Sequence, residues 1–238
     1  MSVFRFKRFD VSNSRSAMKL GTDSVLLGSY APVASSVKKV LDVGTGTGVV
    51  ALMLAQRLSE KDGDGFRIEG IDIDEPSVVE ASENFANSPW AGNLSAERCA
   101  LSNWPGKEYD LIVSNPPFFD DSLLNPDERL SEARHTVSLS YRELCEYASG
   151  ALAGDGILSM VLPKDVQKPL IRVAASFGLY LFECVDVRTT SAKAAKRMVI
   201  SFSKVKRDWQ KKELVMMENG DYTAQYRALM EPFLISLK

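Results

Sequence analysis

Histidine and cysteine are scarce in this chain of 238 residues, and their scarcity argues against several kinds of site. His135 is the only histidine, so neither a histidine-based zinc site nor a serine–histidine triad is expected. Cys99, Cys145 and Cys184 lie far apart, which favours reduced thiols in a cytoplasm over a disulfide framework or a metal site. We therefore expect no bound metal and a cytoplasmic location.

The sequence also lacks long apolar runs and a strong excess of one charge. No apolar run approaches the roughly 20 residues of a membrane span, and the basic, aromatic N-terminus has no apolar signal core. We therefore expect neither export nor a membrane partner. The formal net charge is −2, so any binding of nucleic acid must depend on local basic patches.

Apolar segments alternate with helix-like segments from about residue 38 onward. Strands are predicted over residues 39–44, 67–74, 93–100, 109–114, 156–163, 179–187 and 197–205. Helices are predicted over residues 48–58, 76–85, 140–153 and 165–177. This alternation is typical of an α/β fold with a parallel sheet covered on both faces. The last two strands have no obvious helix between them, so we expect a seven-stranded, mostly parallel sheet with an antiparallel edge.

The chain is expected to have one main domain with an addition at each end. Residues 38–205 form the predicted α/β domain, and residues 1–37 form an N-terminal extension. Residues 206–238 contain a charged hairpin or loop and a short helix, appended to the same domain. A monomer is the default expectation.

The strongest local signal is V-L-D-V-G-T-G-T-G over residues 40–48, where three glycines follow a buried strand and open a helix. Glycine lets the backbone turn sharply and approach a ligand closely, and the helix N-terminus offers free N–H groups and a partial positive field. Asp72 ends the next predicted strand, where a carboxylate can accept both hydroxyls of a ribose. The pattern therefore predicts a nucleotide-like cofactor.

Two cofactors fit this pattern. Gly46, Gly48 and Ala51 match the dinucleotide fingerprint G-x-G-x-x-A, so a nicotinamide-dependent oxidoreductase is one alternative. Asp42 favours S-adenosyl-L-methionine (SAM) instead, because the ammonium group of SAM benefits from nearby acids, and no later feature resembles a hydride-transfer site. The predicted SAM-binding residues here are Asp42, Gly44, Gly46, Gly48 and Asp72.

The motif S-N-P-P-F-F follows the predicted strand at residues 109–114, where ligands of an open parallel sheet bind. An exocyclic base amine is a poor nucleophile, because its lone pair is delocalised into the ring. The Asn115 side-chain oxygen and the Pro116 carbonyl can accept its two N–H groups and align it with a methyl donor. Pro116 and Pro117 fix the backbone, and Phe118 can stack on a flipped base. Alignment and desolvation then supply much of the rate.

Together these motifs resemble those of class I SAM-dependent methyltransferases that methylate amines. The N-terminal stretch narrows the resemblance, with F-x-F-K-x-F over residues 4–9 and M-K-x-G-T-D-x-V-L-L-G over residues 18–28. With S-N-P-P-F-F, the pair Arg134-His135 and a late K-R-M-V-I-S-F strand, the chain is similar to bacterial tRNA adenine N6-methyltransferases acting on adenosine 37 of valine tRNA. The similarity covers about residues 4–205.

The resemblance implies a Rossmann-like class I methyltransferase that transfers a methyl group from SAM to adenine N6 in tRNA. It implies that Lys19, Gly21, Thr22 and Asp23 close over the methionine end of SAM. Ala100 stands where many relatives have an acid near the SAM adenine. The N-P-P-F motif also occurs in enzymes that methylate guanine N2 or a protein glutamine, so these substrates remain alternatives. A nucleic-acid-binding module without catalysis is another.

Local basic patches are candidates for contact with tRNA. Basic and aromatic residues alternate over residues 4–9, which suits phosphate contact and base stacking. The other interpretation is an edge strand with a basic outer face and an aromatic inner face. The candidate contacts are Arg5, Lys7, Arg8, Lys193, Lys196 and Arg197. We expect a structural, hydrogen-bonded role for His135, and Phe119 is either a second pocket wall or a core anchor.

Overall fold

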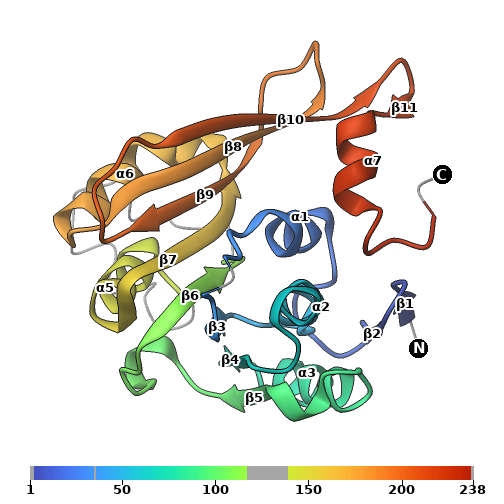
Figure 1. Ribbon diagram of the computed structural model, residues 1–238, viewed down its shortest axis with the longest axis vertical. Helices are drawn as coiled ribbons and strands as arrows, with labels where there is room; N and C mark the ends of the chain where they lie inside the picture. The colour runs from blue at the N-terminus through green and yellow to red at the C-terminus, as the bar shows by residue number, and fades with distance from the viewer. Residues whose placement is uncertain (1–2, 35, 117–138, 237–238) are drawn as a thin grey trace.

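A mixed β-sheet runs through the molecule, and helices cover both of its faces (Figure 1). The structure is a computed structural model that describes residues 3–34, 36–116 and 139–236. The strands are β1 Val3–Arg5, β2 Asp10–Ser12, β3 Lys39–Val43, β4 Arg67–Asp72, β5 Leu94–Arg98, β6 Tyr109–Ser114, β7 Leu152–Pro163, β8 Tyr180–Thr190, β9 Arg197–Ser203, β10 Gln210–Glu218 and β11 Asp221–Tyr222. The α-helices are α1 Thr22–Tyr30, α2 Val49–Asp62, α3 Glu75–Ala86, α5 Tyr141–Ala151, α6 Gln167–Ser176 and α7 Ala224–Met230, and the short 3₁₀ helices are η1 Ala91–Asn93, η2 Leu101–Asn103 and η4 Lys164–Val166.

The strand order of the main sheet is β11-β10-β8-β9-β7-β6-β3-β4-β5. Strands β5, β4, β3, β6 and β7 pair in parallel, so their carboxyl ends share one edge of the sheet. From β3 the chain continues to β4 and β5 on one side and returns through β6 on the other. β3 and β6 are therefore neighbours at the point where the strand order reverses, which is where open α/β sheets bind ligands.

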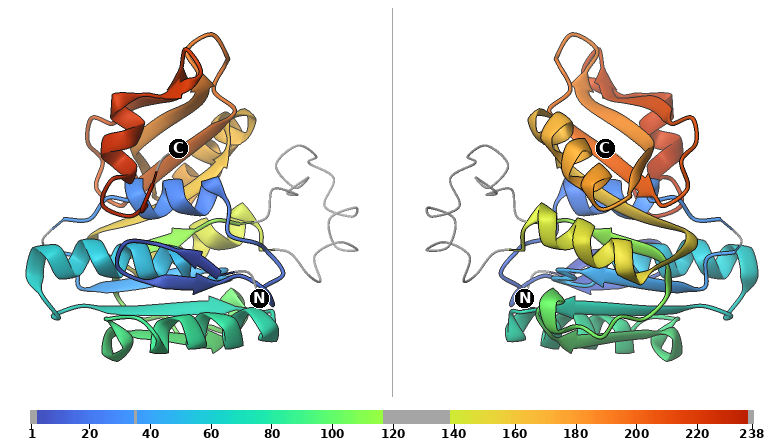
Figure 2. Two further views of the ribbon diagram at one scale, coloured as in Figure 1. Left: turned by 90° about the vertical axis from the view of Figure 1, so that its right-hand side faces the viewer. Right: turned by 90° about the vertical axis from the view of Figure 1, so that its left-hand side faces the viewer.

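Each central strand is buried on both faces, because its successive side chains point into different hydrophobic cores. In β3, Val40 belongs to the core that contains α1, α2 and α3, whereas Leu41 belongs to the core that contains α5 and α6. In β6, Val113 and Ile112 divide in the same way. Figure 2 shows the two groups of helices on opposite sides of the sheet. Near-continuous apolar strands are expected of a parallel sheet covered on both faces.

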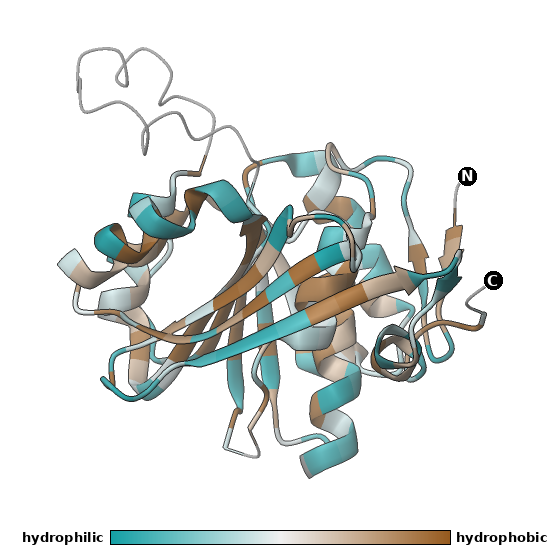
Figure 3. Ribbon diagram, turned by 90° about the horizontal axis from the view of Figure 1, so that it is seen from above, coloured by the Kyte–Doolittle hydropathy of each residue, from teal (hydrophilic) through white to brown (hydrophobic). Residues whose placement is uncertain are grey.

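The predicted α/β fold is confirmed, but the sheet has nine strands rather than seven. β8 and β9 are antiparallel as predicted, yet they do not form the edge, because β10 pairs in parallel with β8 and β11 pairs with β10. Figure 3 shows β10 as hydrophilic in its first half and hydrophobic in its second. Among the described residues β11 pairs only with Met217 and Glu218 of β10, so the charged first half of β10, QKKE, lies along an open edge, where charges protect a sheet from further pairing.

Segments near the two ends of the chain, at residues 6–7 and 231–234, contact each other. β1 and β2 form a separate hairpin, and Phe6 makes a β-bridge with Leu234 near the C-terminus. Lys7 also forms an ion pair with Glu231. Helix α1 lies within the predicted N-terminal extension, yet its residues Leu26 and Leu27 are buried in the main core. Within the described part of the chain, no helix is long and apolar enough to span a membrane.

Candidate active site

The carboxyl ends of β4, β3 and β6 bring three of the predicted site segments together. The glycine loop follows β3, Asp72 is the last residue of β4, and Asn115 comes directly after β6. Because β3 pairs with both of the other strands, the loop lies between Asp72 and Asn115. This arrangement comes from the parallel register alone, since Asp42 is opposite Gly70 on one side and Val113 on the other.

The glycine loop has a backbone conformation that other residues rarely adopt. Gly44, Gly46 and Gly48 all have positive φ, and Gly48 is the N-cap of α2 with φ of 79°. A Cβ atom on Gly48 would lie 2.4 Å from the ring of Phe85, so the turn also needs a residue without a side chain. The three glycines predicted from the sequence therefore form a tight turn that leads into the N-terminus of α2, where the partial positive field of the helix lies.

Two carboxyl groups flank this loop. The Thr45 hydroxyl donates to Asp42 at 2.8 Å, and the Gly46 N–H donates to Asp72 at 3.0 Å. Burial raises the pKa of Asp42 to about 7, and the neighbouring charge of Asp72 adds to this, despite the bond from Thr45. Burial also raises the pKa of Asp72, although backbone N–H groups oppose it. A buried acid and a partly buried acid with raised pKa values fit a ligand that brings hydrogen-bond donors and positive charge.

Asn115 has one end of its amide bound and the other end free among the described residues. Its Nδ2 donates to the Ser24 hydroxyl at 3.1 Å, whereas its buried Oδ1 has no hydrogen-bond partner there. A buried acceptor without a partner carries a free-energy cost, so it is a candidate for binding a ligand N–H group. Ser24 was missed in the sequence, where it follows the G-T-D motif without a signal of its own.

The N-terminal motif residues lie near Asn115 through helix α1. Gly21 is the N-cap of α1, and Thr22 is its first residue. Asp23 forms an ion pair with Arg197 at 3.0 Å, which ties α1 to β9. Lys19 donates from Nζ to the carbonyl oxygens of Ser14 and Ser16 at 2.9 and 3.1 Å. Arg197 was predicted as a nucleic-acid contact, but here it forms an ion pair within the protein.

Of the other residues predicted for this edge, two are described by the structure and four are not. Ala100 follows β5, and the neighbouring Cys99 N–H donates to the Asp72 carbonyl at 3.0 Å, so Ala100 lies on the side of Asp72 away from Asn115. Pro116 is buried directly after Asn115. Four further residues with predicted roles lie outside the described part of the chain: Pro117, Phe118, Phe119 and His135.

The basic and aromatic residues at the N-terminus mainly hold the β1–β2 hairpin on the protein. Phe6 and Phe9 are buried, with ring centroids 4.5 Å apart. Lys7 pairs with Glu231, and Arg8 pairs with Glu60 and lies over the ring of Trp90. Phe6 and Phe9 therefore lie on an inner face, whereas Phe4 is 40% exposed, and contact of this segment with nucleic acid stays a prediction.

Lys193 and Lys196 are placed differently from the N-terminal cations. Both are exposed in the loop between β8 and β9. Strand β9 is antiparallel to both β7 and β8, so β8 runs in the same direction as β7 and β6. The loop that follows β8 therefore lies at the same edge of the sheet as Asn115. The Lys164 N–H donates to the Lys196 carbonyl at 3.1 Å, which joins the loop to the end of β7.

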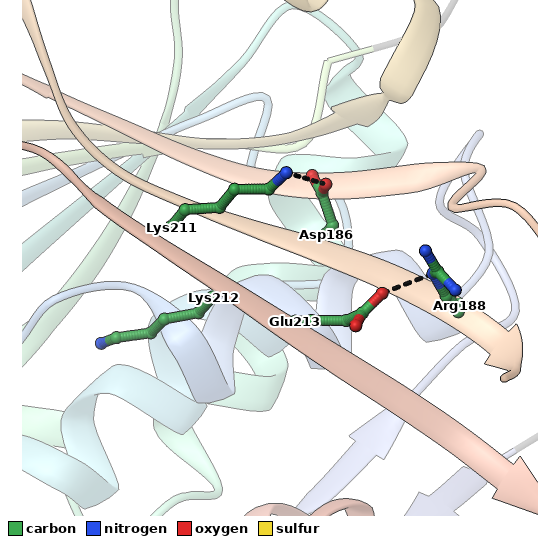
Figure 4. A pocket seen from close by; sticks show the side chains of 5 residues that line it. All are labelled: Asp186, Arg188, Lys211, Lys212 and Glu213. Carbon is green, nitrogen blue, oxygen red and sulfur yellow. Dashed lines mark ion pairs between the residues drawn. The ribbon is translucent and has the colours of Figure 1, made fainter.

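A charged cavity of about 320 Å³ lies farther out, between β8 and β10 (Figure 4). Its cations are already bound to acids: Arg188 pairs with Glu213, Lys211 with Asp186, and Lys212 with Glu183. Pairs of this kind balance each other's charge, so this cavity is a weaker candidate site than the edge near Asn115. Among the described residues, no group of three or more histidine, cysteine, aspartate or glutamate side chains is arranged to hold a metal ion.

Sequence comparison places the chain among methyltransferases. The family model of the methyltransferase small domain matches residues 14–182. A tRNA1(Val) (adenine(37)-N6)-methyltransferase of Flavobacterium psychrophilum is 36% identical over 99% of this chain and 100% of its own length. Relatives with the same name in Bacteroides fragilis and Salmonella arizonae are 38% and 34% identical and also match nearly full length, covering 98% of this chain.

Solved structures support the same fold at low sequence identity. A protein of Agrobacterium tumefaciens described as a predicted O-methyltransferase has a TM-score of 0.67 at 14% identity, covering 89% of this chain and 96% of its own. A geranyl diphosphate C-methyltransferase of Streptomyces coelicolor, solved with S-adenosyl-L-homocysteine, has a TM-score of 0.55 at 12% identity and covers 76% of each chain. At these identities the comparison establishes the fold.

Proposed function

Because this chain belongs to the methyltransferase small domain family, and within it to the tRNA1(Val) (adenine(37)-N6)-methyltransferases, we propose that it methylates N6 of adenine 37 in valine tRNA. The enzyme class and the cofactor, SAM, are those predicted from the sequence. SAM supplies an electrophilic methyl group when bound. The observation that carries the proposal is the buried Oδ1 of Asn115, which has no hydrogen-bond partner among the described residues and lies next to the glycine loop.

The residues at this edge fit both reactants. Asp72 offers a carboxyl group for the hydroxyls of a nucleoside, and the acidic pair of Asp42 and Asp72 suits a ligand with positive charge. On the other side of β3, the Asn115 Oδ1 can accept one N–H of the adenine amine. The Pro116 carbonyl can accept the second. These two bonds orient the amine and favour localisation of its lone pair, so no strong general base is required.

Lys193 and Lys196 support an approach of RNA from the β7–β9 side of Asn115. The opposite side of the same edge, around β4 and α3, carries Asp72, Asp74 and Glu75. A polyanion is attracted to exposed cations and repelled by acids, so its lowest-energy path to Asn115 crosses the lysine loop. In a protein with a net charge of −2, such a local patch must supply the attraction.

Nucleoside mass spectrometry of valine tRNA incubated with the enzyme and SAM tests the proposal. We expect N6-methyladenosine, and fragment mapping should assign it to position 37. The Asn115→Ala variant serves as the inactive control. Methylation of guanine N2 in place of adenine N6 would show that guanine is the substrate. Methylation of a protein glutamine, with none on tRNA, would show that a protein is the substrate. Calorimetric binding of NAD, with no binding of SAM, would contradict the enzyme class itself.

A further inference from the structure

Glu80, on helix α3, binds five donors from one short stretch of the N-terminal segment. Its side chain is fully buried, and its Oε1 accepts the hydroxyls of Ser12 and Ser14 at 3.0 and 3.1 Å. The same atom accepts the N–H groups of Ser14 and Arg15 at 2.7 and 3.0 Å. Its Oε2 accepts the Ser16 N–H at 2.8 Å. No active-site role described above uses this carboxylate.

Three consecutive N–H groups, those of Ser14, Arg15 and Ser16, therefore surround one carboxylate. A concave arrangement of successive N–H groups is a known way for backbone to bind an anion. Burial acts to raise the pKa of Glu80, but the bonds from these three N–H groups and from Ser12 outweigh it and lower the pKa to about 2. The carboxylate is thus charged at neutral pH, and its hydrogen bonds are the stronger, charge-assisted kind.

Asn84, one helical turn farther along α3, binds both the same segment and the glycine loop. Its Oδ1 accepts the Ser12 N–H at 2.8 Å, and its Nδ2 donates to the Ser12 carbonyl at 3.1 Å. The same Nδ2 donates to the Thr47 carbonyl at 2.8 Å. Helix α3 therefore fixes the N-terminal segment and the glycine loop relative to each other.

The segment that Glu80 holds lies directly against the cofactor loop. Ser16 is buried, and its hydroxyl is 3.5 Å from where a Cβ of Gly46 would lie. The Ser16 hydroxyl also bonds to that of Ser77 at 3.0 Å, and Ser77 donates to Asp74 at 2.6 Å. The Asp74 N–H in turn donates to Asp72 at 3.0 Å. A continuous chain of hydrogen bonds thus connects the held segment with the acid predicted to bind ribose.

We propose that Glu80 is a positioning residue for SAM. It holds residues 12–19 across the glycine loop, so that the segment forms one wall of the cofactor pocket without Glu80 touching the cofactor. The proposal rests on the proposed function, because it takes the glycine loop as the SAM site. Without the carboxylate, the three N–H groups lose their acceptor. The segment then keeps the bonds of Asn84 to Ser12 and of Ser77 to Ser16, but these do not replace that acceptor.

Calorimetric titration with SAM and with S-adenosyl-L-homocysteine tests the proposal without the tRNA reaction. For Glu80→Gln we expect Kd for both ligands to rise about tenfold, while kcat at saturating SAM stays within about threefold. The matched control is Glu83→Gln on the same helix, where an exposed carboxylate pairs only with the Arg15 side chain. That variant should bind within about twofold of the wild type. Hydrogen exchange at residues 12–19 should accelerate in Glu80→Gln alone.

Equal binding by the wild type and a folded Glu80→Gln variant would overturn the proposal, as would an equal rise in Kd for both glutamate variants. If Glu80→Gln does not fold, the double variant Ser12→Ala, Ser14→Ala removes two hydroxyl donors and leaves α3 intact. Its Kd should rise by a smaller factor, and unchanged binding would again overturn the proposal. Failure of the wild type to bind SAM would instead contradict the proposed function.

Discussion

The two sides of the proposed active site differ in how their polar groups are satisfied. On the cofactor side, around β3 and β4, Asp42 is bonded by Thr45, Asp72 is bonded by Gly46, and Glu80 is bonded by the N-terminal segment. On the acceptor side, around β6, β7 and β9, the Asn115 Oδ1 has no partner within the described residues. A small cofactor is bound well by groups that the protein already holds in place. A substrate amine needs a hydrogen-bond acceptor that no protein group occupies.

The largest effect is expected from removing the open acceptor. Asn115→Ala should lower kcat for tRNA methylation by about 1,000-fold, roughly 4 kcal/mol, because the amine loses one of its two aligning bonds. SAM affinity should stay within about tenfold, roughly 1.4 kcal/mol. Single-turnover kinetics and calorimetry provide the two measurements. Full activity in this variant would show that Asn115 is not the amine acceptor. The functional difference between the two sides of the site would then be contradicted.

The rigidity of the cofactor side can be tested at the N-cap of α2. In Gly48→Ala, the new Cβ would meet the Phe85 ring at 2.4 Å in a backbone with φ of 79°. We expect the free energy of unfolding to fall by about 3 kcal/mol, from overpacking and left-handed strain together. Gly178→Ala, just after α6, is the control, because φ is 73°, the Leu179 N–H donates to the Ala174 carbonyl as at a left-handed helix end, and nothing lies within 4 Å of a Cβ there.

The control should lower the free energy of unfolding by only about 1 kcal/mol, because only the left-handed conformation disfavours a side chain there. Urea unfolding of both variants without cofactor gives the comparison. If Gly48→Ala were no less stable than Gly178→Ala, the packing of Phe85 against the loop would not be rigid.

The openness of the acceptor side can be tested at its lysines. The double variant Lys193→Glu, Lys196→Glu should raise KM for tRNA about tenfold and weaken its dependence on salt, since phosphate contacts release counterions. SAM affinity should not change. Lys39→Glu is the control, because Lys39 is an exposed lysine that opens β3 at the opposite edge of the sheet. Equal effects of the two changes on KM would indicate a general charge effect rather than a contact surface.

The smallest effect is expected from the pH dependence of Asp42. Its pKa is raised by burial to about 7, so the folded protein binds a proton more tightly than the unfolded chain does. The resulting stabilisation is complete at acid pH and is lost as the pH rises toward 7. The Asp42→Asn variant has no carboxyl group at this position and does not undergo this loss. Its free energy of unfolding, relative to that of the wild type, should therefore increase by on the order of 1 kcal/mol between about pH 5 and about pH 8.

Urea unfolding without cofactor at several pH values measures this change. Asp155→Asn, which alters an exposed carboxyl group, should show no such trend. SAM affinity of Asp42→Asn should fall, because the variant cannot present a negative charge. Parallel pH profiles for Asp42→Asn and the wild type would show that the acid is not strained by burial.

The sequence predicted the central sheet well where the signal was local. β6 runs from Tyr109 to Ser114 as predicted, and α5 begins after its N-cap Ser140, where the sequence predicts the start of a helix. β10 was missed as a strand of the main sheet, because its charged sequence signals a surface and only its pairing with β8 shows otherwise. Glu80 was missed for a related reason, since an acid inside an amphipathic helix looks solvent-exposed until its neighbours are known.

The sequence by itself determined the fold class, the glycine loop and the Asn115 motif, because hydrophobic periodicity and turn residues act over short stretches of chain. Only the tertiary structure decided which groups are left open and which are satisfied. Ser24 and Asn115 are bonded to each other although 91 positions apart, and Ser14 and Glu80 although 66 positions apart. Hydrogen bonds over such separations depend on how the helices pack on the sheet, and no local pattern records them.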